Sequence, residues 1–285
     1  MVGRIAIIGT GRLGATLATA LHRVGVEIAM VANRNAASAQ QLAVQLGSCR
    51  AVTPNEAAQA DLVFLTVPDD ALAPVAAQLP WRHGQAAVHC SGATEVAVLQ
   101  PAADAGAAIG GFHPLQIFSD PAHALDLIAG SSVAIEGPPE LEAQLQQLAE
   151  LLGMHPIHLP PGARALYHGG ASYAASFLLS MLAEAVAAWR SFGVDEAQAL
   201  QALLPLAQGT LAAAASKGLS AAVAGPVSRG DAGVIAQHLA AFDALGPEHA
   251  ALYREMTLRQ LSLVQATHRL SEEQAERVRS ITSPE

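Results

Sequence analysis

The feature that most constrains this chain is a glycine-rich turn near its start. Gly9, Gly11 and Gly14 stand at G-x-G-x-x-G spacing. The apolar run before them, Arg4 to Ile8, predicts a short buried strand, and leucines at every fourth position over residues 13–21 predict one face of a helix. A strand, a glycine turn and a helix in this order are typical of a dinucleotide-binding site.

Each glycine of the turn has an expected task. Gly9 allows the tight turn, Gly11 lets the backbone approach a pyrophosphate, and Gly14 lets the helix pack against the strand. The first N–H groups of the helix and its positive dipole end would face the phosphates. The cofactor-binding residues expected here are Gly9, Thr10, Gly11, Arg12, Leu13 and Gly14.

The end of the next predicted strand, over residues 26–34, indicates which dinucleotide is preferred. An NAD site needs Asp or Glu there to bind the ribose 2′-hydroxyl, but this chain has Asn33 and Arg34, followed by Ser38. No carboxylate would repel a 2′-phosphate, and a guanidinium is present to bind one. The sequence therefore predicts NADP(H) in preference to NAD(H), unless Arg34 is only a solvated surface charge.

Further strands and helices alternate along the first half of the chain. Such alternation predicts a mainly parallel sheet that binds its ligands at the carboxyl ends of the strands. Predicted strands end at residues 67–69, 89–92 and 112–114. Because these ends share one edge of the sheet, Val67, Pro68, Asp69 and Ser91 join the expected cofactor-binding residues.

The second half of the chain has no strand pattern. An alanine-rich helical run of about 30 residues extends from Ala163 to Phe192, and glycines punctuate the helical stretches that follow. Gly169 and Gly170 within this run predict the close approach of another backbone or of the cofactor. We therefore expect an α/β chain: a doubly wound dinucleotide-binding domain over residues 1–160 and an all-helical substrate and dimerisation domain over residues 161–285.

Composition excludes several other classes of protein. Hydrophobic residues make up 52% of the chain and charged residues 14%, so a large core is expected rather than disorder. The net charge of −9 argues against a nucleic-acid-binding surface. The sequence contains no unbroken run of 18 apolar residues, so no membrane span is expected. The apolar run at the start of the chain is too short for a signal peptide. No cluster of His, Cys, Asp or Glu has the spacing of metal ligands. A cytoplasmic protein without a metal is expected.

The motifs taken together resemble a known group. They are IIGTGRLG, LTVPD, HCSGA, GFHPLQIF, ALYH and GPVSRGD, spread over residues 7–231. The chain resembles the 6-phosphogluconate dehydrogenase-like superfamily, in particular an uncharacterised group of Rossmann-like oxidoreductases whose C-terminal half is a domain of unknown function. The resemblance implies a cytoplasmic oxidoreductase that forms a homodimer through its helical domain. It implies no particular substrate.

The chain departs from this superfamily at one position that matters for catalysis. Many relatives carry a lysine near the start of the long helix, where it polarises or protonates a substrate oxygen. The only lysine here, Lys217, lies far along the helical half, and Arg164 stands near the expected position. Arginine can clamp a carboxylate but is a poor proton donor, because its pKa exceeds 12.

His113 is the expected catalytic acid or base. It stands at the end of a predicted strand, before Pro114, and the unperturbed pKa of histidine near 6.5 suits proton exchange at neutral pH. A comparable His-Pro follows the same region in the prephenate dehydrogenases, which supports the role by analogy. The alternative is a structural imidazole that is hydrogen-bonded to a nearby carbonyl.

Other polar residues could complete the site. Ser91 could bind the substrate or the nicotinamide amide, or it could cap the segment that follows. Tyr167 and His168 open the long helix and could face a cleft. The expected catalytic residues are His113, Ser91 and His168, and the expected substrate-binding residues are Arg164, Tyr167, Arg229 and Gln116. Arg229 could instead cross a dimer interface.

Two functions of different kinds remain open. The first is an NADP(H)-dependent reductase or dehydrogenase that moves a hydride between the nicotinamide and a small carbonyl, hydroxy, imine or amine acid. The second is a non-catalytic protein that binds or senses NADPH. The missing lysine slightly favours the second, but the polar residues at the strand ends favour the first more strongly.

Overall fold

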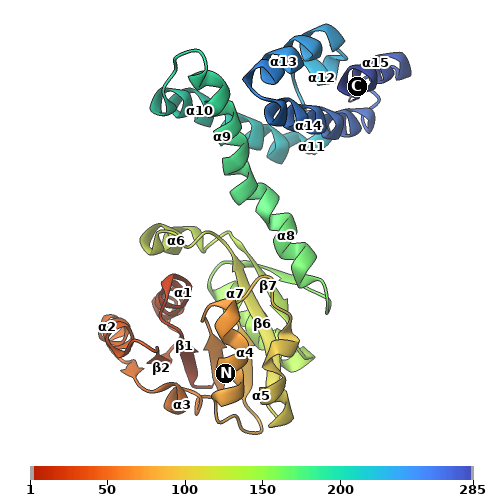
Figure 1. Ribbon diagram of the computed structural model, residues 1–285. Coiled ribbons are helices and arrows are strands. Elements are labelled where there is room, and N and C mark those ends of the chain that lie inside the picture. The colour runs from red at the N-terminus through yellow and green to blue at the C-terminus, as the bar shows by residue number, and fades with distance from the viewer. Residues whose placement is uncertain (1–2, 284–285) are drawn as a thin grey trace. The chain divides into compact units, whose positions relative to one another are not determined.

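The computed structural model of the chain describes residues 3–283, apart from the side chains of residues 121 and 122. The chain divides into two compact units on either side of the bond between Tyr173 and Ala174. This division lies inside the first long helical run, later than the boundary expected after residue 160. The first unit contains the sheet, and the second is helical (Figure 1).

The sheet of the first unit has the strand order β3-β2-β1-β4-β5-β6-β7-β8. Parallel pairing runs from β3 to β6, whereas β7 is antiparallel to β6 and parallel to β8. The crossover beside β1 confirms the doubly wound α/β expectation. The strands are β1 (Ile5–Ile8), β2 (Ile28–Ala32), β3 (Arg50–Ala51), β4 (Leu62–Leu65), β5 (Ala86–His89), β6 (Ala108–Leu115), β7 (Ser132–Glu136) and β8 (His155–His158).

Helices cover both faces of this sheet because successive strand residues point to opposite sides. Ile5 and Ile7 of β1 pack into one hydrophobic core with leucines of the helices on that face, whereas Ala6 and Ile8 pack into the other. The first core includes α1 (Arg12–Arg23), α2 (Ala36–Leu46) and α7 (Pro139–Leu151). The second includes α3 (Pro54–Ala57), α4 (Asp69–Gln78), η1 (Val96–Leu99) and α5 (Gln100–Asp104). The remaining helices of this unit are α6 (Pro121–Leu127) and α8 (Arg164–Ala174).

The second unit has its own small core. Val227, Ile235, Leu261 and Val278 come together there from four different helices. Asp231 caps α13 by accepting a hydrogen bond from Val234 N at 3.4 Å. The helices are α9 (Ser176–Arg190), α10 (Glu196–Lys217), α11 (Leu219–Ala222), α12 (Pro226–Arg229), α13 (Ala232–Leu245), α14 (Pro247–Gln265) and α15 (Glu272–Thr282).

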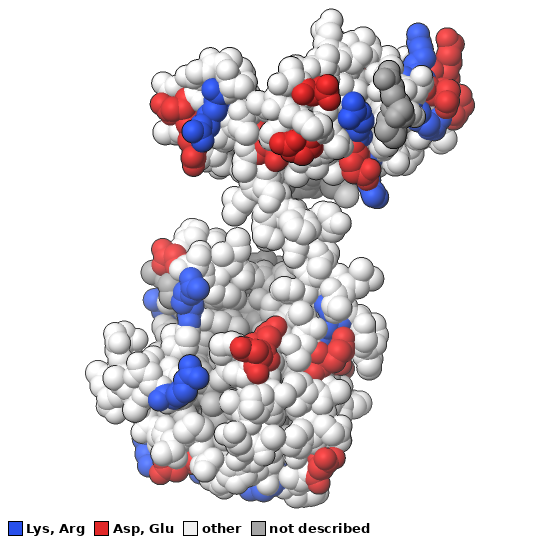
Figure 2. Space-filling view, viewed as in Figure 1, with Lys and Arg blue, Asp and Glu red and all other residues white. Residues whose placement is uncertain are grey.

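The long helical run between the units differs from its prediction. It is interrupted at Ala175, whose φ of −115° and ψ of −92° are not helical, so that α8 and α9 are separate helices. Residues 165–183 contain no charged side chain, and Figure 2 shows the exposed part of this segment as uncharged surface. Arg164–Arg190 as a whole is long and apolar enough to cross a membrane, contrary to the sequence expectation, although a single such run is weak evidence of a span.

Gly169 and Gly170 were expected to mark a close approach. A Cβ atom placed on either glycine would meet no atom of the described residues within 4 Å. No backbone among residues 3–283 therefore explains them. The cofactor or a second copy of the chain remains as the expected neighbour.

Candidate cofactor and catalytic site

The glycine turn has the geometry that its sequence predicts. Gly9 has a φ of +108°, and a Cβ atom there would lie 2.7 Å from the carbonyl oxygen of Thr66. A Cβ atom on Gly14 would overlap the carbonyl oxygen of Gly9, which explains why α1 can approach β1 so closely. A Cβ atom on Gly11 would meet nothing within 4 Å. Space is thus left only at the glycine that is expected to face a pyrophosphate.

The start of α1 leaves backbone donors available. Gly11 is its N-cap, and no side chain caps the helix. The N–H groups of the first turn and the positive dipole end are therefore free to bind an anion. Arg12, the first residue of α1, is exposed, and its Nη1 lies 3.5 Å from the carbonyl oxygen of Ser119.

A polar network joins the turn to the end of β2. Asn33 Nδ2 donates to Thr10 Oγ1 at 2.6 Å, and Thr10 Oγ1 lies 2.7 Å from Ser38 Oγ. Asn33 is thus engaged in holding the turn, while Arg34 beside it is exposed. The residue that is free to bind a phosphate at this edge is therefore Arg34.

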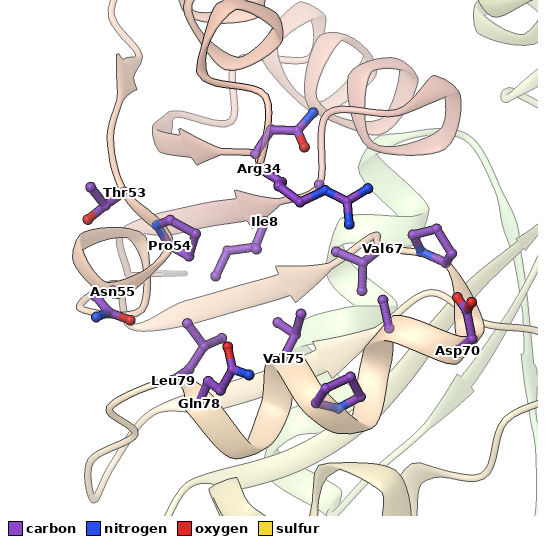
Figure 3. A pocket seen from close by; sticks show the side chains of 15 residues that line it. Ile8, Arg34, Thr53, Pro54, Asn55, Val67, Asp70, Val75, Gln78 and Leu79 are labelled. Carbon is purple, nitrogen blue, oxygen red and sulfur yellow. The ribbon is translucent and has the colours of Figure 1, made fainter.

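A pocket of about 760 Å³ lies next to this edge (Figure 3). Its volume is in the range of ligand-binding pockets. Thr53 and Asn55 lie at one end and Asp70 at the other, while Arg34 reaches over the space from the loop after β2 (Figure 3). The full lining is Ile8, Gly9, Asn33, Arg34, Thr53, Pro54, Asn55, Val67, Pro68, Asp70, Ala71, Pro74, Val75, Gln78 and Leu79.

A second cluster forms around His113, near the end of β6. His113 Nδ1 lies 3.0 Å from Tyr167 Oη, and the rings of His113 and His168 meet edge to face with their centroids 5.7 Å apart. Tyr167 and His168 belong to the first turns of α8. His113 is half-buried and bonded to a side chain, so the purely structural arrangement, bonded to a main-chain carbonyl, does not occur.

Gly92 forms the floor of this cluster. A Cβ atom placed there would lie 2.8 Å from both Cε1 and Nε2 of His113 and would overlap Cδ2 of His168. Only glycine leaves room for both imidazoles at this position. The sequence analysis did not select Gly92 for this role, although it follows directly after Ser91 at a strand end.

Burial changes the charge states that the cluster can adopt. Burial, together with electrostatic interactions with His168 and Arg164, lowers the pKa of His113 to about 4, against a smaller opposing effect of Asp69. Burial raises the pKa of Tyr167 to about 12. The imidazole and the phenol are therefore both neutral at pH 7, which corrects the expectation that His113 titrates near 6.5.

Arg164 does not occupy the place expected for a substrate-binding residue. Its side chain is fully buried, with Nε 2.8 Å from Glu136 Oε2 and Nη1 donating to the carbonyl oxygen of Ser91 at 2.7 Å. A guanidinium with no exposed surface cannot clamp a substrate carboxylate. This burial is not visible in the sequence, because the acidic partner of Arg164 lies 28 residues away at the end of β7.

Ser91 is also structural. The residue is 7% exposed, and its hydroxyl accepts a hydrogen bond from Thr94 N at 3.0 Å. The capping role, which the sequence left open, is the one that the geometry supports. His89, two residues earlier, accepts from Ser91 N through Nδ1, and burial lowers its pKa to about 3.

The remaining expected residues make no hydrogen bond to the His113 cluster among the contacts of the described residues. Asp69 is exposed at the start of α4, and Gln116 turns its Oε1 back to accept from Ile117 N at 2.7 Å. Arg229 is exposed on α12 of the second unit. Among residues 3–283, no group of three or more His, Cys, Asp or Glu side chains could hold a metal ion.

Two known family models match the chain, one mainly in each half. Residues 2–114 match the Rossmann-like domain, and residues 131–260 match a domain of unknown function, DUF2520. Each match covers less than half of the chain, and together they span residues 2–260 apart from residues 115–130. No curated protein matches the sequence significantly.

Several solved structures share the fold of this chain over almost its whole length. Protein TM1727 from Thermotoga maritima has a TM-score of 0.79 at 22% identity, covering 93% of this chain and 99% of that one. A reductive aminase from Aspergillus terreus, solved with NADPH and ethyl levulinate, has a TM-score of 0.68 at 21% identity over 94% and 100%. An imine reductase from Aspergillus terreus, solved with NADPH4 and dibenz[c,e]azepine, has a TM-score of 0.60 at 21% identity over 94% of each chain. These likenesses show that the chain shares their fold.

Proposed function

We propose that this protein is an NADP(H)-dependent oxidoreductase that acts on a small carbonyl or imine compound, or on the corresponding alcohol or amine. The observation that carries the proposal is the combination of a glycine turn shaped for a pyrophosphate with a neutral His113–Tyr167 pair at the same edge of the sheet. A protein that only senses NADPH would have no need of the second feature.

The residues of the first unit fit NADP(H). The open space at Gly11 and the uncapped start of α1 suit the pyrophosphate. Arg34 and the hydroxyl of Ser38 suit a 2′-phosphate, and the pocket beside them would hold the adenosine. Two of the structural neighbours were solved with NADPH or NADPH4, which supports the same choice. The bound cofactor supplies or accepts a hydride.

The His113–Tyr167 pair would move the proton that accompanies the hydride. In reduction, the Tyr167 hydroxyl gives its proton to the substrate oxygen or nitrogen and receives the Nδ1 proton of His113. As Nδ1 gives up its proton, Nε2 takes one from solvent in the same step, so that no imidazolate forms and the ring ends as its other neutral tautomer. Neither ring carries a charge before or after the transfer, which agrees with the pKa of about 4 for His113 and about 12 for Tyr167.

Two arginines were expected to bind a carboxylate of the substrate. Arg164 is buried and paired with Glu136, so it is withdrawn as a carboxylate-binding residue. Arg229 stays the proposed carboxylate-binding residue if the substrate is an acid. We place the protein in the cytoplasm, where it would meet NADP(H).

We also propose a homodimer formed mainly by residues after Ala163. Large apolar side chains are exposed along this part of the chain, 83% for Leu166 and 67% for Leu206 among them. Apolar surface of this kind is typical of an interaction site where it is contiguous. The many alanines between these side chains would allow a second copy of the same helices to approach closely. A second copy is the proposed cover for this surface.

The proposed activity is tested by following NADPH oxidation with a panel of small ketones, aldehydes and cyclic imines. His113→Asn and Tyr167→Phe should each keep NADPH affinity but lose roughly 10²-fold or more in turnover, the usual contribution of an acid–base group. Tight NADPH binding with no turnover of any compound, or full activity in both variants, would instead favour the sensing protein.

A further inference from the structure

The buried guanidinium of Arg164 connects the segments that build the His113 cluster. Through Nη1 it holds the carbonyl oxygen of Ser91, directly before Gly92. Its Nη2 lies against Gly111 of β6, two residues before His113, where a Cβ atom would overlap it. Arg164 itself is the first residue of α8, one helical turn before Tyr167 and His168. One side chain thus touches or begins every segment that carries a residue of the cluster.

Stability alone does not explain this arginine. A buried ion pair recovers little more than the cost of removing two charges from water, and apolar residues of similar size often serve as well. Arg164 Nη2 also finds no hydrogen-bond partner among the residues that the structure describes, which adds to that cost. The placement is therefore better explained by what the charge does to its neighbours.

The neighbours of Arg164 include the two rings of the proposed proton relay. The charged or titratable groups that face His113 are His168, Arg164, Asp69, Tyr167 and His89. Asp69 and His168 are exposed to solvent, whereas Arg164 is fully buried. Burial and His168 lower the pKa of His113 more than Arg164 does, but Arg164 contributes a permanent charge that solvent does not reach. The charge disfavours an imidazolium at His113 and a neutral phenol at Tyr167, opposing part of the effect of burial on the latter.

We propose that Arg164, held by Glu136, is a positioning residue that sets the geometry and the charge state of the His113–Tyr167 pair. The expected effect of Arg164 on turnover rests on the proposed function, whereas its expected effect on the titration of His113 does not. Glu136 fixes the guanidinium from β7, and Glu95 fixes the helix start by accepting from Arg164 N at 3.3 Å. Arg164 then acts on the reaction through His113 and Tyr167, without touching the substrate.

The test uses the cofactor-free protein and three variants. Arg164→Met alone would leave Glu136 buried and unpaired, so the principal variant is Arg164→Met combined with Glu136→Gln. Arg164→Lys keeps the positive charge but loses the several N–H donors of the planar guanidinium. Arg259→Met with Glu255→Gln removes the exposed ion pair on α14 and serves as the matched control.

The first readout is the titration of the His113 ring, followed by nitrogen NMR on imidazole-labelled protein and assigned with His113→Asn. In the double variant the midpoint should rise by about one pH unit or more, the size expected when a nearby like charge is removed. It should stay near the parent value in Arg164→Lys and in the control. An unchanged midpoint in the folded double variant would overturn the inference.

The second readout separates this inference from the proposed function. NADPH affinity should stay within twofold in all three variants, while turnover in the double variant falls about tenfold or more through kcat, and Arg164→Lys recovers part of it. A shifted His113 midpoint in a protein that turns over no substrate would refute the oxidoreductase and leave the electrostatic role of Arg164 standing. A loss of turnover equal to the loss of folded protein, with no shift, would show a merely structural residue.

Discussion

At the scale of single residues, the two buried histidines of the site should make the fold sensitive to acid. Burial holds His113 and His89 neutral in the folded chain, with pKa values of about 4 and about 3 against an ordinary 6.5. The unfolded chain therefore binds more protons below pH 6.5. Their stabilising contribution should be complete above pH 6.5 and decline as the pH falls toward 4, by up to ~1.4 kcal/mol per pH unit for each ring.

Urea unfolding at a series of pH values between 4 and 8 measures this effect. His113→Asn should make the free energy of unfolding depend less steeply on pH in the acidic range. The slope should fall by up to the amount that corresponds to the uptake of one proton on unfolding. An identical slope in the parent and in this variant would show that His113 titrates normally in the folded chain.

Gly92 carries the sharpest single-residue prediction. Gly92→Ala should keep the fold and NADPH binding but displace the imidazoles of His113 and His168, with a loss of roughly 10²-fold in turnover. Gly209→Ala is the control, because a Cβ atom there meets nothing within 4 Å and should stabilise α10 by up to ~1 kcal/mol. Full activity in Gly92→Ala would remove the histidine pair from the catalytic account.

The structure brings together three residues that the sequence singles out, and their roles in catalysis stay predictions. His113, Tyr167 and His168 were selected because polar side chains at strand ends and at a helix start meet at one edge of an α/β sheet. The burial of Arg164 was not predictable, since it depends on Glu136 and Gly111 from strands that are distant in the sequence. A motif records which residue types are present, whereas pairing and burial are set by tertiary packing.

At the scale of elements, the start of α8 deserves a direct test because it carries Tyr167 and His168. Glu95 caps it by accepting from Gly162 N at 3.1 Å and Arg164 N at 3.3 Å. Glu95→Ala should cost about 1 kcal/mol of stability at this helix end and speed hydrogen exchange of the amides at its start. Thr53→Ala, which removes a comparable cap from α3, should leave exchange in α8 unchanged.

Elements with strong local signals were predictable, and those shaped by distant contacts were not. Thr53 and Glu56 form the capping box that their spacing predicts, at 3.3 Å and 2.8 Å. The break at Ala175 has no such signal, because neither glycine nor proline marks it in an alanine-rich run. The antiparallel direction of β7 was not predictable either, because strand direction does not alter local sequence preference.

At the scale of the whole molecule, the exposed apolar surface after Ala163 predicts self-association. Sedimentation at micromolar concentration, without detergent, should show a homodimer. Leu206→Glu, which places a charge on the proposed interface, should shift the population toward monomer, whereas Leu151→Glu, on an exposed position of α7, should not. A parent protein that sediments as a monomer would contradict the assembly and leave the exposed leucines without a cover.

Titration of the purified protein with NADPH and with NADH decides whether the glycine turn and Arg34 select NADP(H). We predict that NADPH binds at least ~10-fold tighter, a difference of ~1.4 kcal/mol that one charged contact to a phosphate can supply. Arg34→Ala should lose most of this difference while its affinity for NADH stays the same, and Arg50→Ala, an exposed arginine outside the pocket lining, should change neither. Equal affinity of the parent protein for both dinucleotides, or no binding of either, would contradict the account.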